Sequence, residues 1–342
     1  MTPVDLSRSV VRALRRAVED GELPAGVVVP ERVVVERTRP GGVGDYASPV
    51  AFGVAKGAGV APRGVAEVLA PRLAGLPGIE RVEITGAGFL NFVLAASSVG
   101  EFVRGIRAGG ASYGLAPEGC RAPEPVDGGP GAALRERVVR AAVQRIAASQ
   151  GVGGDRAAAD APRVAPVAKR DGDVVAAYGA GAAVWAMLGV PAAETPVFSA
   201  SLLVQDESNE FFRVRYAHDR ARALTRNAGQ LGFSSEPGEP GEPGEPGSPG
   251  EVHGADVLLG VLRDHPLVLE AAAHHRAPER LVRQLVAIAD ALLDFQYHVL
   301  PKGDEKPSAA HRARLALAEA AGTVLAGGLA LLGIDVPDHH HL

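Results

Sequence analysis

Sequence runs typical of β-strands occur only in the first hundred residues of this chain. After about residue 176, most segments show the apolar spacing of amphipathic helices. Runs rich in β-branched or alternating apolar residues predict strands at 27–29, 32–36, 81–84 and 89–94. Apolar residues three and four apart predict helices at 3–19, 47–58, 62–73, 132–148, 178–188, 211–228, 255–262, 266–275, 278–299 and 308–332. The pattern predicts an α+β multi-domain protein, with a small α/β domain followed by an all-α helical bundle.

Composition sets the expected domain boundaries. We expect the α/β domain to cover residues 1–115 and the helical domain to cover 176–342, because residues 116–175 contain proline- and glycine-rich stretches typical of a linker. Within the helical domain, the triplet Glu-Pro-Gly repeats from Glu236 to Gly247. So few triplets without partner chains cannot form a collagen-like triple helix. We therefore expect a disordered, acidic insertion at 232–253.

Charge and cysteine content narrow the class of protein. The net charge is −5, and the stretch from Pro196 to the end holds 13 Lys and Arg against 20 Asp and Glu, so no overall positive charge indicates nucleic-acid binding. The single cysteine, Cys120, excludes a disulfide within the chain and a metal site built from several cysteines. This composition favours a cytoplasmic protein. Because no uninterrupted apolar run reaches about 18 residues, we expect no membrane segment.

Two segments of the chain resemble the same enzyme family. The first contains Gly-Asp-Tyr-Ala at 44–47 and Gly-Ala-Gly-Phe-Leu-Asn-Phe at 86–92, and the second is Glu-Ser-Asn-Glu-Phe-Phe-Arg-Val-Arg-Tyr-Ala-His-Asp-Arg at 207–220. Both resemble arginyl-tRNA synthetase. The first is similar to its N-terminal domain, which contacts the tRNA elbow. The second is similar to the entry of its C-terminal helical anticodon-binding domain, called DALR.

The catalytic signatures that the resemblance implies are missing. Class I synthetases bind ATP with a His-x-Gly-His signature, but this chain has no histidine before His218 and none later in that spacing. Phosphate-binding and dinucleotide-binding glycine motifs are also absent. Residues 131–146 and 167–175 resemble the helix after the first signature and the loop of the second. The roughly 20 residues between them are too few for one strand–helix–strand unit. We therefore expect an inactive paralogue with no cofactor.

Asn91 is the first candidate for RNA contact. It lies where the family's Gly-Phe-x-Asn strand presents an asparagine to a base of the tRNA elbow, and its amide can both donate to and accept from a base edge. The alternative is an asparagine that ends or bulges a strand.

The other candidates lie on predicted helices. Spacing of four residues aligns Tyr216 with Arg220, and His218 with Arg222 and Arg226, so two stripes could face one way. The alternative is a solvated helix surface with pairs such as Asp219–Arg222. For the further basic residues in the bundle, the alternative to RNA contact is likewise a solvated helix surface. The predicted RNA-binding residues are Asn91, Tyr216, His218, Arg220, Arg222, Arg226, Arg312 and Arg314.

Two functions remain open at this point. The first is binding of tRNA or another structured RNA without aminoacylation, which Asn91 and the clustered arginines favour. The second is a protein-interaction or regulatory module that contacts the genuine synthetase or another enzyme and binds no RNA. The acidic C-terminal half favours the second.

Overall fold

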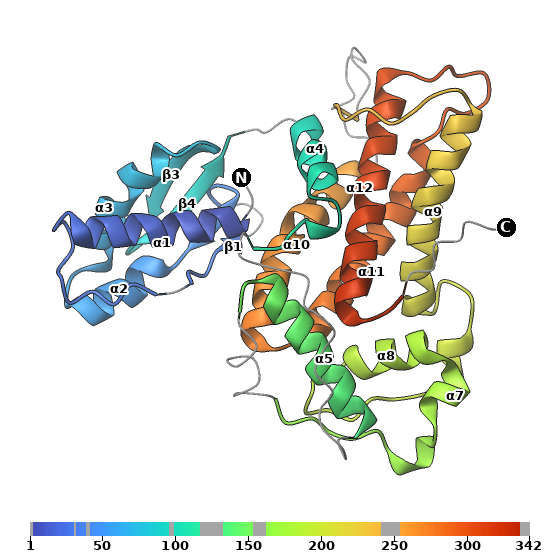
Figure 1. Ribbon diagram of the computed structural model, residues 1–342. Helices are drawn as coiled ribbons and strands as arrows, with labels where there is room; N and C mark the ends of the chain where they lie inside the picture. Colours follow the sequence, from blue (N-terminus) through green and yellow to red (C-terminus); the bar gives the residue numbers. More distant parts are fainter. Residues whose placement is uncertain are drawn as a thin grey trace. The chain divides into compact units, whose positions relative to one another are not determined.

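The chain divides into two compact units, residues 1–97 and 98–342, in the computed structural model of the protein (Figure 1). The structure describes residues 3–30, 32–38, 42–95, 99–116, 133–152, 162–240 and 254–335. Each unit has its own hydrophobic core, and the two cores share no residue. The first unit carries a small antiparallel sheet and the second is helical, which confirms the predicted fold class.

The first unit places the two halves of its sequence motif side by side. Its sheet has the order β1 (Glu36–Arg37), β2 (Tyr46–Ser48), β4 (Phe89–Leu94), β3 (Ile79–Thr85), with every neighbouring pair antiparallel. Tyr46 pairs with Phe92 and Ala47 with Asn91. The Gly-Asp-Tyr-Ala segment at 44–47 therefore pairs with the strand that carries Asn91.

Three helices complete the first unit: α1 (Pro3–Glu19), α2 (Val50–Ala58) and α3 (Pro62–Ala74). The turn between β3 and β4 requires glycine at position 88. Its φ is +143°, and a Cβ there would lie 2.9 Å from the backbone of Pro62 at the start of α3. The hairpin therefore fits closely against α3, which also packs on β3.

The predicted strands at 27–29 and 32–36 are wrong for most of their length. Only Glu36–Arg37 pairs as a strand, and the first two residues of the helix predicted at 47–58 belong to strand β2 instead. Two backbone carbonyls of the predicted strand accept hydrogen bonds from serine hydroxyls instead of from a neighbouring strand. Ser7 donates to the Val33 carbonyl at 2.8 Å, and Ser48 donates to the Val34 carbonyl at 2.7 Å. The β-branched run signalled burial of alternate valines, but pairing depends on a neighbouring strand that the run itself does not specify.

The regular secondary structure in the described part of the second unit is helical, and loops join the helices. Its longer helices are α4 (Val99–Gly109), α5 (Leu134–Ser149), α8 (Ala180–Leu188), α9 (Glu210–Gln230), α10 (Ala255–His275), α11 (Pro278–Phe295) and α12 (Ala309–Leu332). Short helical turns are η1 (Gly110–Ser112), η2 (Lys169–Asp171), α7 (Val174–Tyr178), η3 (Ala200–Leu203) and η4 (Gln296–His298). Helix α12, red in Figure 1, packs against α9, α11 and α4.

Helix α12 is long and apolar enough to cross a membrane by length and composition alone. However, 72% of its most apolar window is buried inside the helical unit. That burial is what a central core helix requires, and its neighbours α9 and α11 cover it directly.

The domain boundary expected near residue 115 lies instead at residue 97. Helix α4 belongs to the helical unit because Val103 and Ile106 are buried in its core. Helix α5, expected within a linker, also contributes Val139 and Val143 to that core.

The predicted break before Pro266 is also wrong. Helix α10 continues through this proline, whose neighbours His265 and Leu269 are buried. Tertiary packing outweighs the cost of a proline inside the helix.

Arg135 ties the middle of the chain to the bundle. Its side chain is fully buried and donates to the carbonyls of Ala165 at 2.7 Å and Pro191 at 3.0 Å. It also donates to those of Met187, Ala192 and Glu194. Burial lowers the pKa of Arg135 from its ordinary value, yet a guanidinium keeps its proton in proteins. One side chain therefore fixes the path of two loops.

The insertion expected to be disordered at 232–253 is partly ordered. Residues 233–240, which we call the strap, pack on the helical unit through buried Phe233. Ser235 donates to Glu319 at 2.5 Å, and the Glu236 amide donates to the Arg312 carbonyl at 3.1 Å. Residues 241–253 lie outside the described residues, so the prediction is untested there. The apolar anchor at Phe233 lies just before the repeat, which explains why repeat composition alone did not reveal it.

Candidate nucleic-acid interface

Helix α9 carries most of the predicted site, and its first turn explains its position. The Asn209 side chain accepts hydrogen bonds from the amides of Phe211 at 3.0 Å and Phe212 at 3.3 Å, which is an N-cap. The same side chain donates to the Leu202 and Val204 carbonyls, so the cap also fixes the preceding loop. Apolar residues on one face of α9 then bury against α11 and α12.

His218, Arg222 and Arg226 come together as the spacing predicted. They line a groove of about 1000 Å³ between α4, α9 and α12, and the small residues Ala221 and Gly322 also line it. Arg226 is exposed, Arg222 is half-buried and His218 is buried. The groove therefore presents two guanidinium groups from α9, while His218 lies deeper and approaches Asp219 with its Nδ1 at 3.3 Å.

The groove contains one carboxylate on α12, Glu319, that its neighbours hold in place. Thr225 donates to its Oε1 at 3.0 Å, and Arg107 approaches its Oε2 at 3.8 Å. Ser235 of the strap donates to the same Oε2 at 2.5 Å. Glu319 thus connects α4, α9 and the strap at one end of the groove, and its acceptors are largely satisfied by these donors.

Arg107 is a residue that the sequence did not point to. It lies on α4 and adds a third guanidinium to the groove opposite the α9 pair. The amphipathic spacing of α4, with Val103 and Ile106 inward, could have indicated that Arg107 is on the surface. It could not indicate which domain α4 packs on.

Tyr216 and Arg220 do not line the groove. Tyr216 is 45% exposed and stacks on Phe212 with ring centroids 5.8 Å apart and planes 11° from parallel. It borders a separate hollow of about 410 Å³ with Leu203 and Arg215. Arg220 donates through Nε to Gln296 Oε1 at 2.6 Å, which ties α9 to η4.

Arg312 and Arg314 are occupied by the strap. Arg312 donates to the Ser234 carbonyl at 3.3 Å and lies 5.8 Å from the centre of the Phe233 ring. Arg314 donates through Nε to the Pro240 carbonyl at 2.7 Å and through Nη1 to the His298 carbonyl at 3.3 Å. Both arginines therefore make defined contacts, unlike the solvated side chains of the alternative interpretation.

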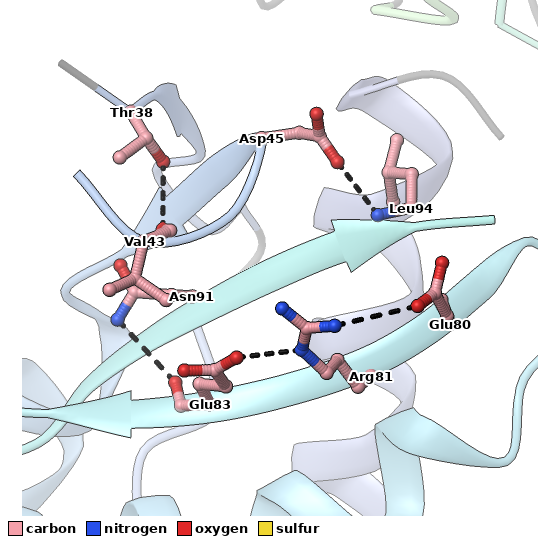
Figure 2. Close-up of polar contacts among 8 residues, drawn as sticks. All are labelled: Thr38, Val43, Asp45, Glu80, Arg81, Glu83, Asn91 and Leu94. Carbon is pink, nitrogen blue, oxygen red and sulfur yellow. Dashed lines mark hydrogen bonds and ion pairs between the residues drawn. The ribbon is translucent and has the colours of Figure 1, made fainter. Parts of the chain in front are cut away.

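Asn91 belongs to the other unit, and its amide nitrogen is used within the β3–β4 hairpin. It donates to Thr85 Oγ1 at 2.7 Å. It also lies 3.4 Å from the Glu83 carbonyl, a contact drawn in Figure 2. The side chain is buried, with 5% of its surface exposed. Asn91 neither ends nor bulges its strand, because it pairs regularly with Ala47 on β2 and Glu83 on β3. Its side chain stabilises its own hairpin instead, and a role in reading a base stays a prediction.

The glycine loop before β2 is fixed from the same sheet. The Asp45 amide donates to the Phe92 carbonyl at 2.7 Å, and the Asp45 carboxylate accepts from the Leu94 amide at 2.8 Å, a bond drawn in Figure 2. A Cβ at Gly44 would lie 2.7 Å from the Phe92 carbonyl oxygen, and its φ is +77°. The loop is therefore a structural turn that docks on β4.

Two domain families match this chain. Residues 5–94 match the arginyl tRNA synthetase N terminal domain, and residues 214–339 match the DALR anticodon binding domain. Neither match covers residues 95–213. The ordered α5, the Arg135 loops and the first turn of α9 thus lie between the two matched regions.

Curated relatives include arginine–tRNA ligases. That of Frankia alni is 54% identical over 123 residues, which cover 35% of this chain and 22% of the relative. That of Micrococcus luteus is 45% identical over 117 residues, which cover 33% of this chain and 21% of the relative. The matches span about a fifth of each relative's length.

Among solved structures, Thermus thermophilus arginyl-tRNA synthetase aligns with a TM-score of 0.61 at 14% identity. The alignment covers 99% of this chain and 100% of that chain. At this identity the likeness concerns the fold alone.

Proposed function

We propose that this chain, which is an arginyl-tRNA synthetase-like protein, binds tRNA or another structured RNA in the α4–α9–α12 groove and does not aminoacylate it. The observation that carries the proposal is the convergence of Arg107, Arg222 and Arg226 on one groove of the DALR-type unit. Guanidinium groups on a groove wall suit phosphate oxygens, which they can bind with two parallel hydrogen bonds.

The local charge of the groove supports the proposal despite the net charge of −5. Three arginines line it against two carboxylates, Asp219 and Glu319. Glu319 already accepts hydrogen bonds from Thr225 and Ser235. A phosphate backbone entering the groove would meet arginines from two sides, and such contacts supply affinity without selecting a sequence.

The lack of ligase activity is proposed from the residues between the two matched regions. The family's His-x-Gly-His signature has no counterpart, because the first histidine of the chain is His218. In the described part of residues 99–335 the secondary structure is helical, so no sheet is seen there to carry a nucleotide. Arginine-dependent exchange of ATP with pyrophosphate should therefore stay at the level of a sample without protein. Exchange above that level would contradict this part of the proposal.

The test of RNA binding is a triple variant, Arg107→Gln, Arg222→Gln and Arg226→Gln. We expect its affinity for unfractionated tRNA to fall about tenfold or more, because three phosphate contacts are lost. The slope of log affinity against log salt should become shallower by about two units. Fluorescence anisotropy with labelled tRNA at several KCl concentrations measures both quantities.

A matched control separates the groove from the overall charge. Arg163, Arg170 and Arg280 are exposed arginines of the same unit outside the groove, and changing all three to Gln alters the net charge by the same amount. We expect this control to bind nearly as the wild type does. Equal losses in the two variants would mean that net charge rather than the groove governs binding, and no tRNA binding by the wild type at low salt would remove the proposal.

A second candidate function is suggested by the hollow beside Tyr216. Leu203 and Val204, 56% and 37% exposed, border it together with Tyr216. Exposed apolar residues gathered at one hollow are typical of protein contact surfaces. A protein-interaction module of this kind would be sensitive to Leu203→Asp and Tyr216→Ala. RNA binding in the groove would be unchanged by these two substitutions.

A further inference from the structure

The strap, residues 233–240, holds the two arginines of α12 that the sequence predicted as RNA contacts. Arg312 is bound at Ser234 and Phe233, and Arg314 at Pro240. Hydrogen bonds from a guanidinium to a neutral carbonyl are weaker than those to a phosphate oxygen. The strap thus occupies these arginines with acceptors that a polyanion could replace.

The strap is attached at both ends of its contact. Phe233 is 5% exposed in the helical core, and Glu239 accepts a hydrogen bond at 3.0 Å from the Val99 amide at the first residue of α4. Between them, a Cβ at Gly100 would lie 3.0 Å from the Gly238 Cα, so strap and helix backbones nearly touch. The strap therefore lies across α4 and α12, next to the groove that these helices form with α9.

The strap also brings negative charge to this edge of the groove. Residues 233–240 contain no lysine or arginine. Glu236 and Glu239 are the two glutamates of the strap, and both are exposed. An acidic segment beside a row of arginines repels an approaching phosphate backbone and raises the effective cost of binding there.

We propose that the strap is a built-in competitor of RNA, which withholds Arg312 and Arg314 and must leave α12 before RNA can use them. The inference rests on the proposed RNA binding of this unit. It extends that binding surface from the groove to the strap-covered face of α12. Ser235 couples the two areas, because it binds Glu319 on the wall of the groove.

Two segment replacements of equal length test the inference. The first replaces residues 235–240 with glycine and serine, and the second replaces residues 242–247 in the same way. Each removes two glutamates and two prolines, so net charge and chain length stay matched. Phe233, Arg312 and Arg314 are unchanged in both. Thermal melting followed by circular dichroism verifies that each protein folds.

The replacement of 235–240 should bind unfractionated tRNA about fivefold tighter or more than the wild type. Its slope of log affinity against log salt should steepen by about 1.5 units, since two further arginines then contact phosphate. Adding Arg312→Gln and Arg314→Gln to this protein should abolish the gain. The replacement of 242–247 should change binding far less. Two single variants make the same comparison of tRNA affinity with the loss of one negative charge each: Glu239→Gln in the strap and Glu242→Gln in the control segment.

Hydrogen exchange supplies a second measurement on the unaltered chain. The Glu236 amide is bonded to the Arg312 carbonyl, so its exchange should accelerate when tRNA is added. Equal gains from both replacements, or no gain in either while the wild type binds tRNA, would overturn the strap inference and leave the groove intact. No tRNA binding by any of these proteins would overturn the proposed function, and the strap's role with it.

Discussion

The buried guanidinium of Arg135 concentrates an unusual share of hydrogen bonding in one residue. Five carbonyls accept from it, one before α8, one in the last turn of α8 and three in the loop after α8, and water cannot reach a side chain with no exposed surface. Arg135→Met keeps much of the length but removes every donor. We expect it to lower the free energy of unfolding by about 3 kcal/mol or more, because buried carbonyls lose their partners. The free energy of unfolding of Arg135→Lys, which has a single ammonium, should lie between those of the wild type and Arg135→Met. Urea denaturation measures all three values, and a Met variant as stable as the wild type would contradict this prediction.

His265 makes stability depend on pH. Its ring is buried on α10, stacked on Tyr113 with planes 12° apart, and its Nδ1 has no hydrogen-bond partner within the described residues. Burial lowers the pKa of His265 from 6.5 to about 4. The unfolded chain therefore binds the proton more readily, so the stabilising contribution is complete above pH 6.5 and is lost as the pH falls toward 4.

A substitution isolates this contribution. The full difference corresponds to roughly 3 kcal/mol across that pH range. His265→Leu should flatten the decline in the free energy of unfolding between pH 7 and pH 4.5. His274→Gln, at an exposed position of the same helix, should follow the wild type. Urea denaturation at a series of pH values tests both, and parallel curves for His265→Leu and wild type would show that this histidine does not titrate as described.

At the scale of elements, α12 contacts its neighbours through small residues whose tolerance differs. A Cβ at Gly322 would lie 2.8 Å from the Ala221 Cβ on α9, whereas one at Gly327 would lie 3.6 Å from its nearest neighbour. Gly327→Ala should raise the free energy of unfolding by about 0.5–1 kcal/mol through better helix propensity. Gly322→Ala should lower it by about 1–2 kcal/mol, because the α9 backbone must move. The melting temperatures of the two variants should shift in opposite directions. Equal shifts would contradict the close approach of Gly322 to Ala221 between α12 and α9.

At this scale, the sequence predicted features that arise within one helix, but not those that depend on contacts between helices distant in the sequence. The alignment of His218, Arg222 and Arg226 follows from helical spacing within α9 alone, and the structure places all three on one groove. Arg107 escaped prediction because its position depends on α4 packing against α12, a contact between distant parts of the chain.

Similar non-local causes explain the errors in the fold. The strand predicted at 32–36 gave way to side-chain bonds from Ser7 and Ser48, which come from either side of it in the sequence. The repeat expected to be disordered has an ordered beginning because Phe233 inserts into a core formed by other helices. In each case the local pattern was correctly seen, and tertiary contacts decided the outcome.

At the scale of the whole molecule, the separation into two cores has a direct consequence. Among the described residues, the buried core of the first unit runs from Leu6 to Phe92 and that of the second from Val103 to Ile334. Separate cores allow separate cooperative unfolding. We expect residues 1–97 and 98–342, produced as two proteins, each to fold and to melt in a single transition. Together they should reproduce the circular-dichroism spectrum of the full chain.

The same division assigns the RNA-binding activity. Arg107, Arg222 and Arg226 all lie in residues 98–342, so that piece should keep most of the tRNA affinity and the full salt dependence of the intact chain. Residues 1–97, where the Asn91 amide nitrogen is held by Thr85, should bind at least tenfold more weakly at the same salt concentration. Anisotropy titrations of both pieces decide this. Strong binding by residues 1–97 alone would move the interface to the first unit, and a fragment 98–342 that fails to fold would show that the second core depends on the first.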